Sequence, residues 1–204
     1  MLKNDLQKIV LGLFTSRVRV KLISLFFTNP RDSFHMRQIS RITGEQINAV
    51  RRELISLEKA GLLTSQQYGI KKFYSLNASF PLFNEIRSIF VKTYGLGYYV
   101  FLHRKELGDV IFAILTHTYL NREDSEENNP DLIVVGEVNR IVLERIIRDS
   151  EEVEKRKLHY RIFSAKELEI AKKRKDLIIY SALVLPRSMI IGTDEDFVMY
   201  GGII

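Results

Sequence analysis

The stretch that decides the fold is "MRQISRITGEQINAVRRELISLEKAGLL", residues 36 to 63. Its first part predicts a short helix with Ile39 and Ile42 facing inward, because the two residues are one helical turn apart. Gly44 suits the left-handed conformation in which many helices end. A second apolar period begins directly after this glycine, so the stretch predicts two helices joined by a turn of about three residues.

The second helix is predicted from a longer apolar period that stops at Gly61. Its inward positions fall at i, i+3, i+7 and i+10, as on one face of a helix. They are occupied by Ile47, Val50, Leu54 and Leu57. Two helices at this spacing, with a short turn that contains glycine, are typical of a helix-turn-helix.

Two further helices are expected upstream, over residues 6–14 and 18–27, where apolar residues again recur at helical spacing. Pro30 cannot continue a helix, so the second of them should end near Thr28. His35 precedes the first helix of the motif, and we expect it to be a packed or exposed loop residue and not a ligand.

Beyond the second helix of the motif the apolar period changes to that of strands. "LLTSQQ" (residues 62–67) and "KKFYSL" (71–76) are joined through "YGI", where Gly69 can supply the positive φ that a tight hairpin needs. A hairpin in this position is a wing, with Lys71 and Lys72 at its tip or just past it. Residues 73, 74 and 76 should form its apolar underside.

Together with "SRVRVKLISLF" (16–26) and "YGIKKFYSLN" (68–77), the stretch resembles the winged helix-turn-helix of ArsR-like transcriptional regulators. The resemblance covers roughly residues 14 to 78. It implies a DNA-binding domain over residues 1–79, whose second motif helix enters the major groove.

The distribution of charge also indicates a polyanionic partner. Residues 1 to 97 hold 15 Lys and Arg against 6 Asp and Glu, a net charge of +9, while the remainder holds 16 against 19, a net charge of −3. A localised positive charge of this size favours nucleic acid first and an anionic membrane second. A basic face that only confers solubility is the alternative.

The face opposite the apolar stripe of the second motif helix supplies candidate base-reading side chains. Arginine can bond guanine, and glutamine or asparagine can bond adenine, whereas lysines on the wing neutralise phosphates. The candidate DNA-binding residues are Gln46, Asn48, Ala49, Arg51, Arg52, Tyr68, Lys71 and Lys72.

Two alternatives apply to these candidates. The arginines could instead form ion pairs with Glu45, Glu53 or Glu58 on or beside the same helix. The two amide side chains, at positions 46 and 48, could instead cap the start of the helix.

A connecting helix is expected over residues 80–97, ended by Gly95 and Gly97. Its apolar face has two possible roles, a seam between two copies of the chain and packing against its own domain. The dimer would imply twofold DNA sites. The face consists of Leu82, Ile86, Ile89, Phe90 and Thr93.

The second half, residues 98–204, predicts strands that alternate with helices, which is typical of a small α/β domain. The strands are "DVIFAILT", "PDLIVVGE" and "LHYRIFS", the helices are "VNRIVLERIIRDSEEVEKR" and "AKELEIAKKRK", and a last apolar segment surrounds "SMIIG". This order resembles the minimal nucleotidyltransferase fold of the DNA polymerase β superfamily. The fold class of the whole chain is therefore α+β.

The nucleotidyltransferase resemblance implies a Gly-Ser turn for a nucleotide phosphate and a carboxylate pair for magnesium. His117 and Thr118 stand where Gly-Ser is expected, and a side chain in place of glycine blocks close backbone approach. Asn129 and Asp131 stand where the Asp-x-Asp is expected, so the carboxylate pair is broken. These four residues are predicted to form a degenerate nucleotide cleft.

The third requirement, a carboxylate on a later strand, is also unmet, because that strand offers only His159 and Arg161 as polar residues beside Tyr160. The acids between residues 123 and 127 are expected to lie in a solvated, mobile loop and not to substitute for the missing ligands. The charge-dense segments "EEVEKRK" and "KKRK" are expected to be solvated helical faces.

The sequence contains no cysteine and only four scattered histidines, so we expect no disulfide, no structural zinc, no metal site and no cofactor. With no apolar run of 18 residues and no secretory signal, we expect a cytoplasmic protein that does not enter a membrane.

The function expected is a sequence-specific, double-stranded DNA-binding transcriptional regulator, a homodimer whose second domain is not an enzyme and serves assembly or the sensing of a small-molecule or nucleotide effector. The first alternative is an active nucleotidyltransferase targeted by its winged helix. The second is an adaptor whose winged helix binds a protein.

Overall fold

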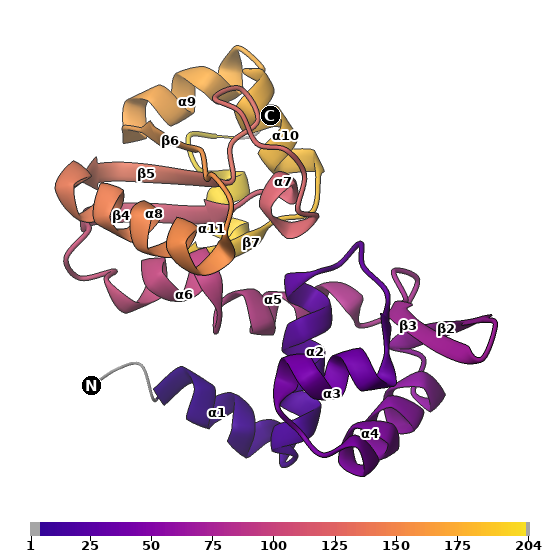
Figure 1. Cartoon of the computed structure of the whole chain (residues 1–204). Helices are drawn as coiled ribbons and strands as arrows, with labels where there is room; N and C mark the ends of the chain where they lie inside the picture. Colours follow the sequence, from indigo (N-terminus) through magenta and orange to yellow (C-terminus); the bar gives the residue numbers. More distant parts are fainter. Residues whose placement is uncertain (1–4, 203–204) are drawn as a thin grey trace. The chain divides into compact units, whose positions relative to one another are not determined.

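The structure, a computed structural model, describes residues 5 to 202, with side chains from Lys8 onward. Two compact units divide the chain, Met1–Phe90 and Val91–Ile204, and each contains its own sheet (Figure 1). The fold class is thus a mixture of α and β structure with two sheets, as predicted. The chain divides within the segment predicted as a connecting helix.

The first unit begins with two helices, α1 (Asp5–Phe14) and α2 (Arg17–Thr28), which confirms the upstream prediction. The hydroxyl oxygen of Ser16 caps α2 by accepting a hydrogen bond from the backbone N–H of Arg19. The helix ends at Thr28, two residues before Pro30, as the proline requires.

The decisive stretch folds into α3 (Met36–Thr43) and α4 (Ile47–Lys59), with Gly44 between them at a φ of +68°. The predicted helices and the predicted left-handed residue are therefore both confirmed. Val50, Leu54 and Leu57 of α4 are buried, as their spacing predicts. They pack into one apolar core with α2 and the wing.

Two of the predicted inward positions are wrong. Ile42 is 50% exposed and Ile47 is 39% exposed, so neither residue belongs to the core. Because successive residues advance by 100° around a helix, Ile47 lies about 60° from Val50, at the margin of the buried stripe. Ile42 lies about 60° from buried Ile39, on the side opposite to Met36, which packs against the core.

The wing consists of β2 (Leu63–Tyr68) and β3 (Lys71–Leu76), which pair antiparallel with Tyr68 opposite Lys71. The predicted hairpin is confirmed, and Gly69 has a φ of +57°. A short strand directly before α3, β1 (Phe34–His35), pairs with the other edge of β3. His35 also caps α3, because its Nδ1 accepts a hydrogen bond from the backbone N–H of Gln38 at 3.3 Å.

Helix α5 (Phe83–Val91) packs against its own unit, which was one of the two roles considered for the connecting segment. The ring of Phe90 lies 5.6 Å from the ring of Phe14 and 6.2 Å from that of Phe27. The apolar face of α5 therefore packs against the core formed by α1 and α2.

The prediction that the connecting helix runs on to Gly95 and Gly97 is wrong. Helix α5 ends at Val91, and a separate helix, α6 (Gly95–Leu102), begins at Gly95 with a φ of +59°. At Gly97 an added Cβ would lie 2.2 Å from the carbonyl oxygen of Val91, so the glycine permits a close approach of the backbone and does not end a helix.

The second unit is a three-layer arrangement of helices on both faces of a mixed sheet (Figure 1). The strand order is β6-β5-β4-β7; β4 is antiparallel to both of its neighbours and β5 is parallel to β6. Besides α6, its elements are β4 (Gly108–Leu115), α7 (His117–Leu120), β5 (Leu132–Val138), α8 (Arg140–Glu154), β6 (Tyr160–Phe163), α9 (Ala165–Lys173), α10 (Leu177–Val184), β7 (Ser188–Ile191) and α11 (Asp194–Met199).

Alternation along the strands separates the two cores of this unit. Leu132 and Val134 of β5 face α6 and α8, whereas Ile133 and Val135 face α9, α10 and α11. All four side chains are fully buried, so both faces of the sheet are covered. The predicted strands and the helices α8 and α9 are confirmed, and the sequence did not reveal α10 and α11.

Candidate nucleic-acid interface and a buried ion pair

The outward face of α4 carries most of the predicted base-reading side chains. Asn48, Arg51 and Arg52 are exposed and Ala49 is half-buried. Gln46 occupies the N-cap position, yet its side chain accepts no capping hydrogen bond. The side chain of Asn48 forms no hydrogen bond among the described residues either, so neither amide is used as a helix cap.

Two acidic residues beside or on α4 are held by basic residues of α2. Lys21 Nζ lies 2.6 Å from Glu45 Oε1, and its hydrogen bond holds the pKa of that carboxyl below the ordinary value. Arg19 Nε lies 2.8 Å from Glu53 Oε2. These pairs attach the start and the middle of α4 to α2.

The third acidic residue, Glu58, is held by the wing. Lys72 Nζ lies 2.8 Å from Glu58 Oε2, and Ser65 donates a hydrogen bond to Glu58 Oε1. Both donors lower the pKa of Glu58. The three acids that could have paired with Arg51 and Arg52 therefore have other partners, and within residues 5–202 neither arginine forms an ion pair.

Helix α3 adds two guanidinium groups that the sequence analysis missed. Arg37 and Arg41 are exposed, and in the described chain neither side chain forms an ion pair or a hydrogen bond. Their spacing of four residues, with Ile39 buried between them, was an available signal, because it places both arginines on one outward face. Four unpaired arginines thus lie on the two helices of the motif.

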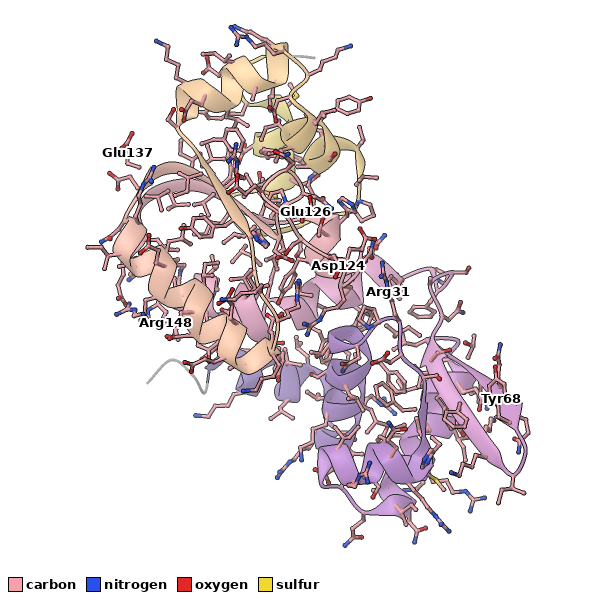
Figure 2. All side chains as sticks on the ribbon, turned by 45° about the horizontal axis from the view of Figure 1, so that its top comes forward. Arg31, Tyr68, Asp124, Glu126, Glu137 and Arg148 are labelled. Atoms are coloured by element: carbon pink, nitrogen blue, oxygen red, sulfur yellow. The ribbon has the colours of Figure 1, made fainter. Side chains whose placement is uncertain are left out.

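The tip of the wing is exposed, and the wing is attached to α4 one residue pair from its loop. Tyr68 is 62% exposed (Figure 2), and Lys71 is exposed without a partner among the described residues. Lys72 is placed differently from the phosphate contact that the sequence suggested, because its ammonium group is engaged by Glu58 and lies 5.2 Å from the ring centre of Tyr74.

In the second unit, Asp131 is fully buried and both of its carboxylate oxygens are used. Arg156 Nη2 donates to Oδ1 at 2.6 Å, and the backbone N–H of His159 donates to Oδ2 at 3.0 Å. A buried carboxylate requires such compensation, since an unpaired charge is strongly disfavoured away from water. The guanidinium group of Arg156 supplies the positive charge that compensates the buried carboxylate of Asp131.

The other three predicted cleft residues lie near the same end of the sheet. Thr118 is fully buried and donates a hydrogen bond to Asn129 Oδ1 at 2.6 Å. His117 Nε2 lies 3.4 Å from Glu123 Oε2. The backbone N–H of Thr116 donates to the carbonyl oxygen of Asp131, which joins the start of α7 to the start of β5.

Arg156 also joins Asp131 to a second buried carboxylate, that of Glu154. Arg156 Nε lies 3.5 Å from Glu154 Oε2, and Arg122 Nη1 lies 3.1 Å from the same oxygen. Tyr119 donates its hydroxyl hydrogen to Glu154 Oε1 at 2.6 Å, and burial followed by this negative charge raises the pKa of the phenol. Two carboxylates and two guanidinium groups form one network.

The prediction that "EEVEKRK" is a solvated helical face is therefore wrong in part. Helix α8 ends at Glu154, and Lys155 has a φ of +56°. This left-handed residue turns the chain so that the Glu154 and Arg156 side chains both point inward, to 0% and 20% exposure.

The acidic loop after α7 is attached to the unit, contrary to the prediction of a mobile segment. The backbone N–H of Glu123 donates to the carbonyl oxygen of Thr118, and the Ser125 hydroxyl lies 3.0 Å from His159 Nδ1. Asp124 and Glu126 are exposed, as predicted for a solvated loop (Figure 2). Within residues 5–202, no three acidic or histidine side chains gather in a way that could hold a metal ion.

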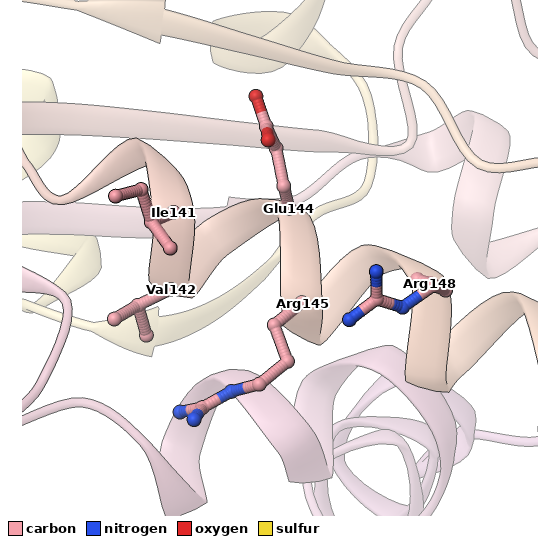
Figure 3. A pocket seen from close by; sticks show the side chains of 5 residues that line it. All are labelled: Ile141, Val142, Glu144, Arg145 and Arg148. Carbon is pink, nitrogen blue, oxygen red and sulfur yellow. The ribbon is translucent and has the colours of Figure 1, made fainter.

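A shallow hollow lies along α8, lined by Ile141, Val142, Glu144, Arg145 and Arg148 (Figure 3). Arg145 is already paired with Glu106 at 2.8 Å. The described helices include none that is long and apolar enough to cross a membrane.

No protein-family model and no curated protein matches this chain. Among solved structures, the reduced form of HlyU from Vibrio cholerae N16961 matches with 15% sequence identity and a TM-score of 0.31. The match covers 49% of this chain and 87% of HlyU. A TM-score of this size does not establish a shared fold.

Proposed function

We propose that the chain is a sequence-specific regulator of transcription that binds double-stranded DNA through its first unit. The observation that carries this proposal is the outward face of α4, where Arg51 and Arg52 are exposed while Glu45, Glu53 and Glu58 are neutralised by other elements. A helix with free cations and no free anion on its outward face suits a polyanionic groove.

In this proposal α4 enters the major groove, where an arginine can donate two hydrogen bonds to guanine and an amide side chain can bond adenine. The exposed arginines of α3 and Lys71 of the wing contact phosphates, which fix the register without specifying sequence. Because one such unit offers few base contacts, we propose that the protein binds twofold sites as a homodimer in the cytoplasm.

We further propose that the second unit is catalytically inactive and serves assembly or effector binding. The contact between Asp131 and Arg156 supports this role. A magnesium ion held by Asp131 would have to displace a guanidinium group 2.6 Å away, and Asn129 offers a neutral amide in place of a second carboxylate.

Duplex DNA selected from a randomised library tests the proposal for DNA binding. We expect the logarithm of the affinity of the full chain to fall linearly with the logarithm of the salt concentration. Arg52→Ala should weaken specific binding by about tenfold or more, whereas Lys166→Ala, an exposed cation of the second unit, should not. Equal effects of the two substitutions would argue against readout by α4.

Incubation with labelled nucleoside triphosphates and magnesium tests the proposed inactivity. We expect no transfer of label to protein or nucleic acid. Transfer that disappears in Asp131→Asn, in a variant that remains folded, would show instead that the second unit is an active nucleotidyltransferase.

A further inference from the structure

Helix α10 of the second unit presents an apolar stripe to solvent. Leu177, Tyr180 and Val184 recur at i, i+3 and i+7, and they are 80%, 47% and 59% exposed. The opposite side of the helix, which includes Ile179, is buried in the core. None of the eight residues of α10 is charged. A surface helix ordinarily carries charged or polar side chains on its outward face, and a helix that is apolar all round is ordinarily buried.

Tyr180 lies near the middle of this stripe, which we call the α10 stripe. Its hydroxyl forms no hydrogen bond among the described residues, although the ring is about half exposed. Tyrosine combines a large apolar ring with a polar tip, and it is enriched at the centres of protein interfaces. The α10 stripe therefore has the composition of a contact surface and not of a solvated helical face.

The start of the α10 stripe is basic. Residues 173–175, two lysines and an arginine, lead directly into the helix. All three side chains are exposed, and none forms an ion pair within residues 5–202. This end of the stripe thus offers cations that a partner can use.

The far end of the α10 stripe is acidic. Arg187 donates to the carbonyl oxygen of Ala182 in the last turn of α10 at 2.8 Å and pairs with Asp194 at 2.7 Å, which places the start of α11 beside this turn. Glu195 and Asp196 follow on α11, both exposed and, in the described chain, without an ion pair. Because Arg187 neutralises only Asp194, two negative charges remain at this end.

The three helices around the stripe are fixed to one another. Lys172 is buried, contrary to the solvated face expected for "KKRK", and its Nζ donates to the carbonyl oxygens of Val198 and Tyr200 at 3.0 Å each. It thereby joins the end of α9 to the end of α11, while Arg187 joins α10 to the start of α11. A preorganised surface loses little conformational entropy when a partner covers it.

An apolar stripe with opposite charges at its two ends is complementary to a second copy of itself. When two α10 helices lie antiparallel about a twofold axis, the basic end of each faces the acidic end of the other, and the apolar side chains cover one another. A wholly anionic partner would match only one end. The helix is about 12 Å long, so both ends fall within a standard interface of about 800 Å² on each partner.

We propose that two copies of the chain associate through antiparallel α10 helices of their second units. This inference rests on the proposed homodimer and on the assembly role proposed for the second unit, and it assigns that role to a defined surface. Tyr180, near the middle of the stripe, faces the same residue of the other copy across the twofold axis.

Sedimentation of the full chain without DNA, over a series of concentrations, tests the proposal. We expect the wild type to dimerise and Tyr180→Glu to raise the dissociation constant by about a hundredfold or more, because two like charges would meet at the axis. Ile141→Glu is the matched control, since Ile141 is an apolar residue of the same unit, 81% exposed, outside the stripe. It should dimerise as the wild type does, and circular dichroism should show that both variants are folded.

Reversal of the charges at the two ends tests the antiparallel arrangement. Arg174→Glu and Glu195→Arg should each weaken the dimer by about tenfold, because each places like charges together twice. The variant with both substitutions should regain the affinity of the wild type. An equimolar mixture of the two single variants should form heterodimers, which a defect in folding would not produce.

The outcomes separate this inference from the proposals on which it rests. If the wild type is a dimer and Tyr180→Glu dimerises equally well, the α10 interface is wrong and the homodimer stands. If the wild type remains a monomer with and without DNA, both are wrong, and the stripe belongs to a different polypeptide. Arg52→Ala should remain a dimer while it loses affinity for DNA, so failure of DNA binding is recognised separately.

Discussion

The guanidinium group of Arg156 lies 2.6 Å from a carboxylate oxygen of Asp131, whose side chain is fully buried. Asp131 lies directly before β5, and Arg156 lies two residues after the end of α8, the helix that follows this strand. The sequence alone suggests Asp131 as what remains of a metal-binding pair. In the fold the same residue belongs to an internal ion pair.

This pair should contribute strongly to the stability of the second unit. We expect Arg156→Met to lower the free energy of unfolding by about 3 kcal/mol or more, because it leaves a buried carboxylate without its charged partner. Urea denaturation of the full chain, followed by circular dichroism, measures the change. Arg161→Met removes an exposed arginine of the same unit and should change stability by less than about 0.5 kcal/mol. Equal effects of the two substitutions would contradict a structural ion pair.

The attachment of the wing to α4 should depend on pH. Hydrogen bonds from Lys72 and Ser65 lower the pKa of Glu58 below its ordinary value of 4.5, and Glu58 raises the pKa of Lys72 above 10.5. The folded state therefore binds fewer protons than the unfolded state near pH 4 and more near pH 11. The stability from Glu58 is present above about pH 4.5 and is lost as the pH falls through the lowered pKa. The stability from Lys72 is present below about pH 10.5 and is lost as the pH rises through the raised pKa of Lys72.

Glu58→Gln is the variant that measures this contribution. We expect the difference in unfolding free energy between wild type and Glu58→Gln to be largest between about pH 5 and pH 10 and to shrink on both sides. Glu152→Gln, on an exposed residue of α8, should show no such profile. A difference that stays constant from pH 3 to pH 7 would contradict the charged pair.

The arginines of α3 should act on DNA differently from those of α4. Arg41→Ala should weaken binding to all duplexes alike and reduce the slope of log affinity against log salt by about one, as expected for a phosphate contact. Arg52→Ala should relax the preference for one base pair. If Arg41→Ala instead changes sequence preference, the assignment of α3 to the phosphate backbone is wrong.

Gly97 should be a glycine at which alanine is poorly tolerated. Its Cβ would lie 2.2 Å from the carbonyl oxygen of Val91, and because this neighbour is backbone the clash cannot be relieved by a rotamer change. We expect Gly97→Ala to destabilise the protein by about 1–3 kcal/mol or more. Gly12→Ala is the control, since nothing lies within 4 Å of that position and it should stabilise α1 by up to about 1 kcal/mol. A neutral Gly97→Ala in a thermal melt would show that the α5–α6 junction is not close-packed.

The local elements of the first unit were predictable because their signals are local. Pro30, Gly44 and Gly69 act through their own backbone conformations, which do not depend on distant residues. The errors at Ile42 and Ile47 are positions at the margin of an apolar stripe. Whether such a residue is buried depends on where the neighbouring helices end, and periodicity does not contain this information.

The candidate site was predictable in part for the same reason. The outward positions of Arg51 and Arg52 follow from helical geometry once Val50 and Leu54 face inward. That both arginines lack partners does not follow, because the acids beside them are neutralised by residues on α2 and the wing. Lys21, for instance, lies 24 positions before Glu45 in the chain.

The sequence by itself determined the helices and the hairpin of the first unit, the turns at Gly44 and Gly69 and the outward positions of Arg51 and Arg52, since these depend on backbone preference and on periods of 3.6 and 2. Only the tertiary structure decided which charged side chains form ion pairs with one another. Ion pairs form between side chains that are distant in the chain, and their partners are chosen by the packing of α2 on α4 and by the left-handed turn that directs Arg156 to Asp131.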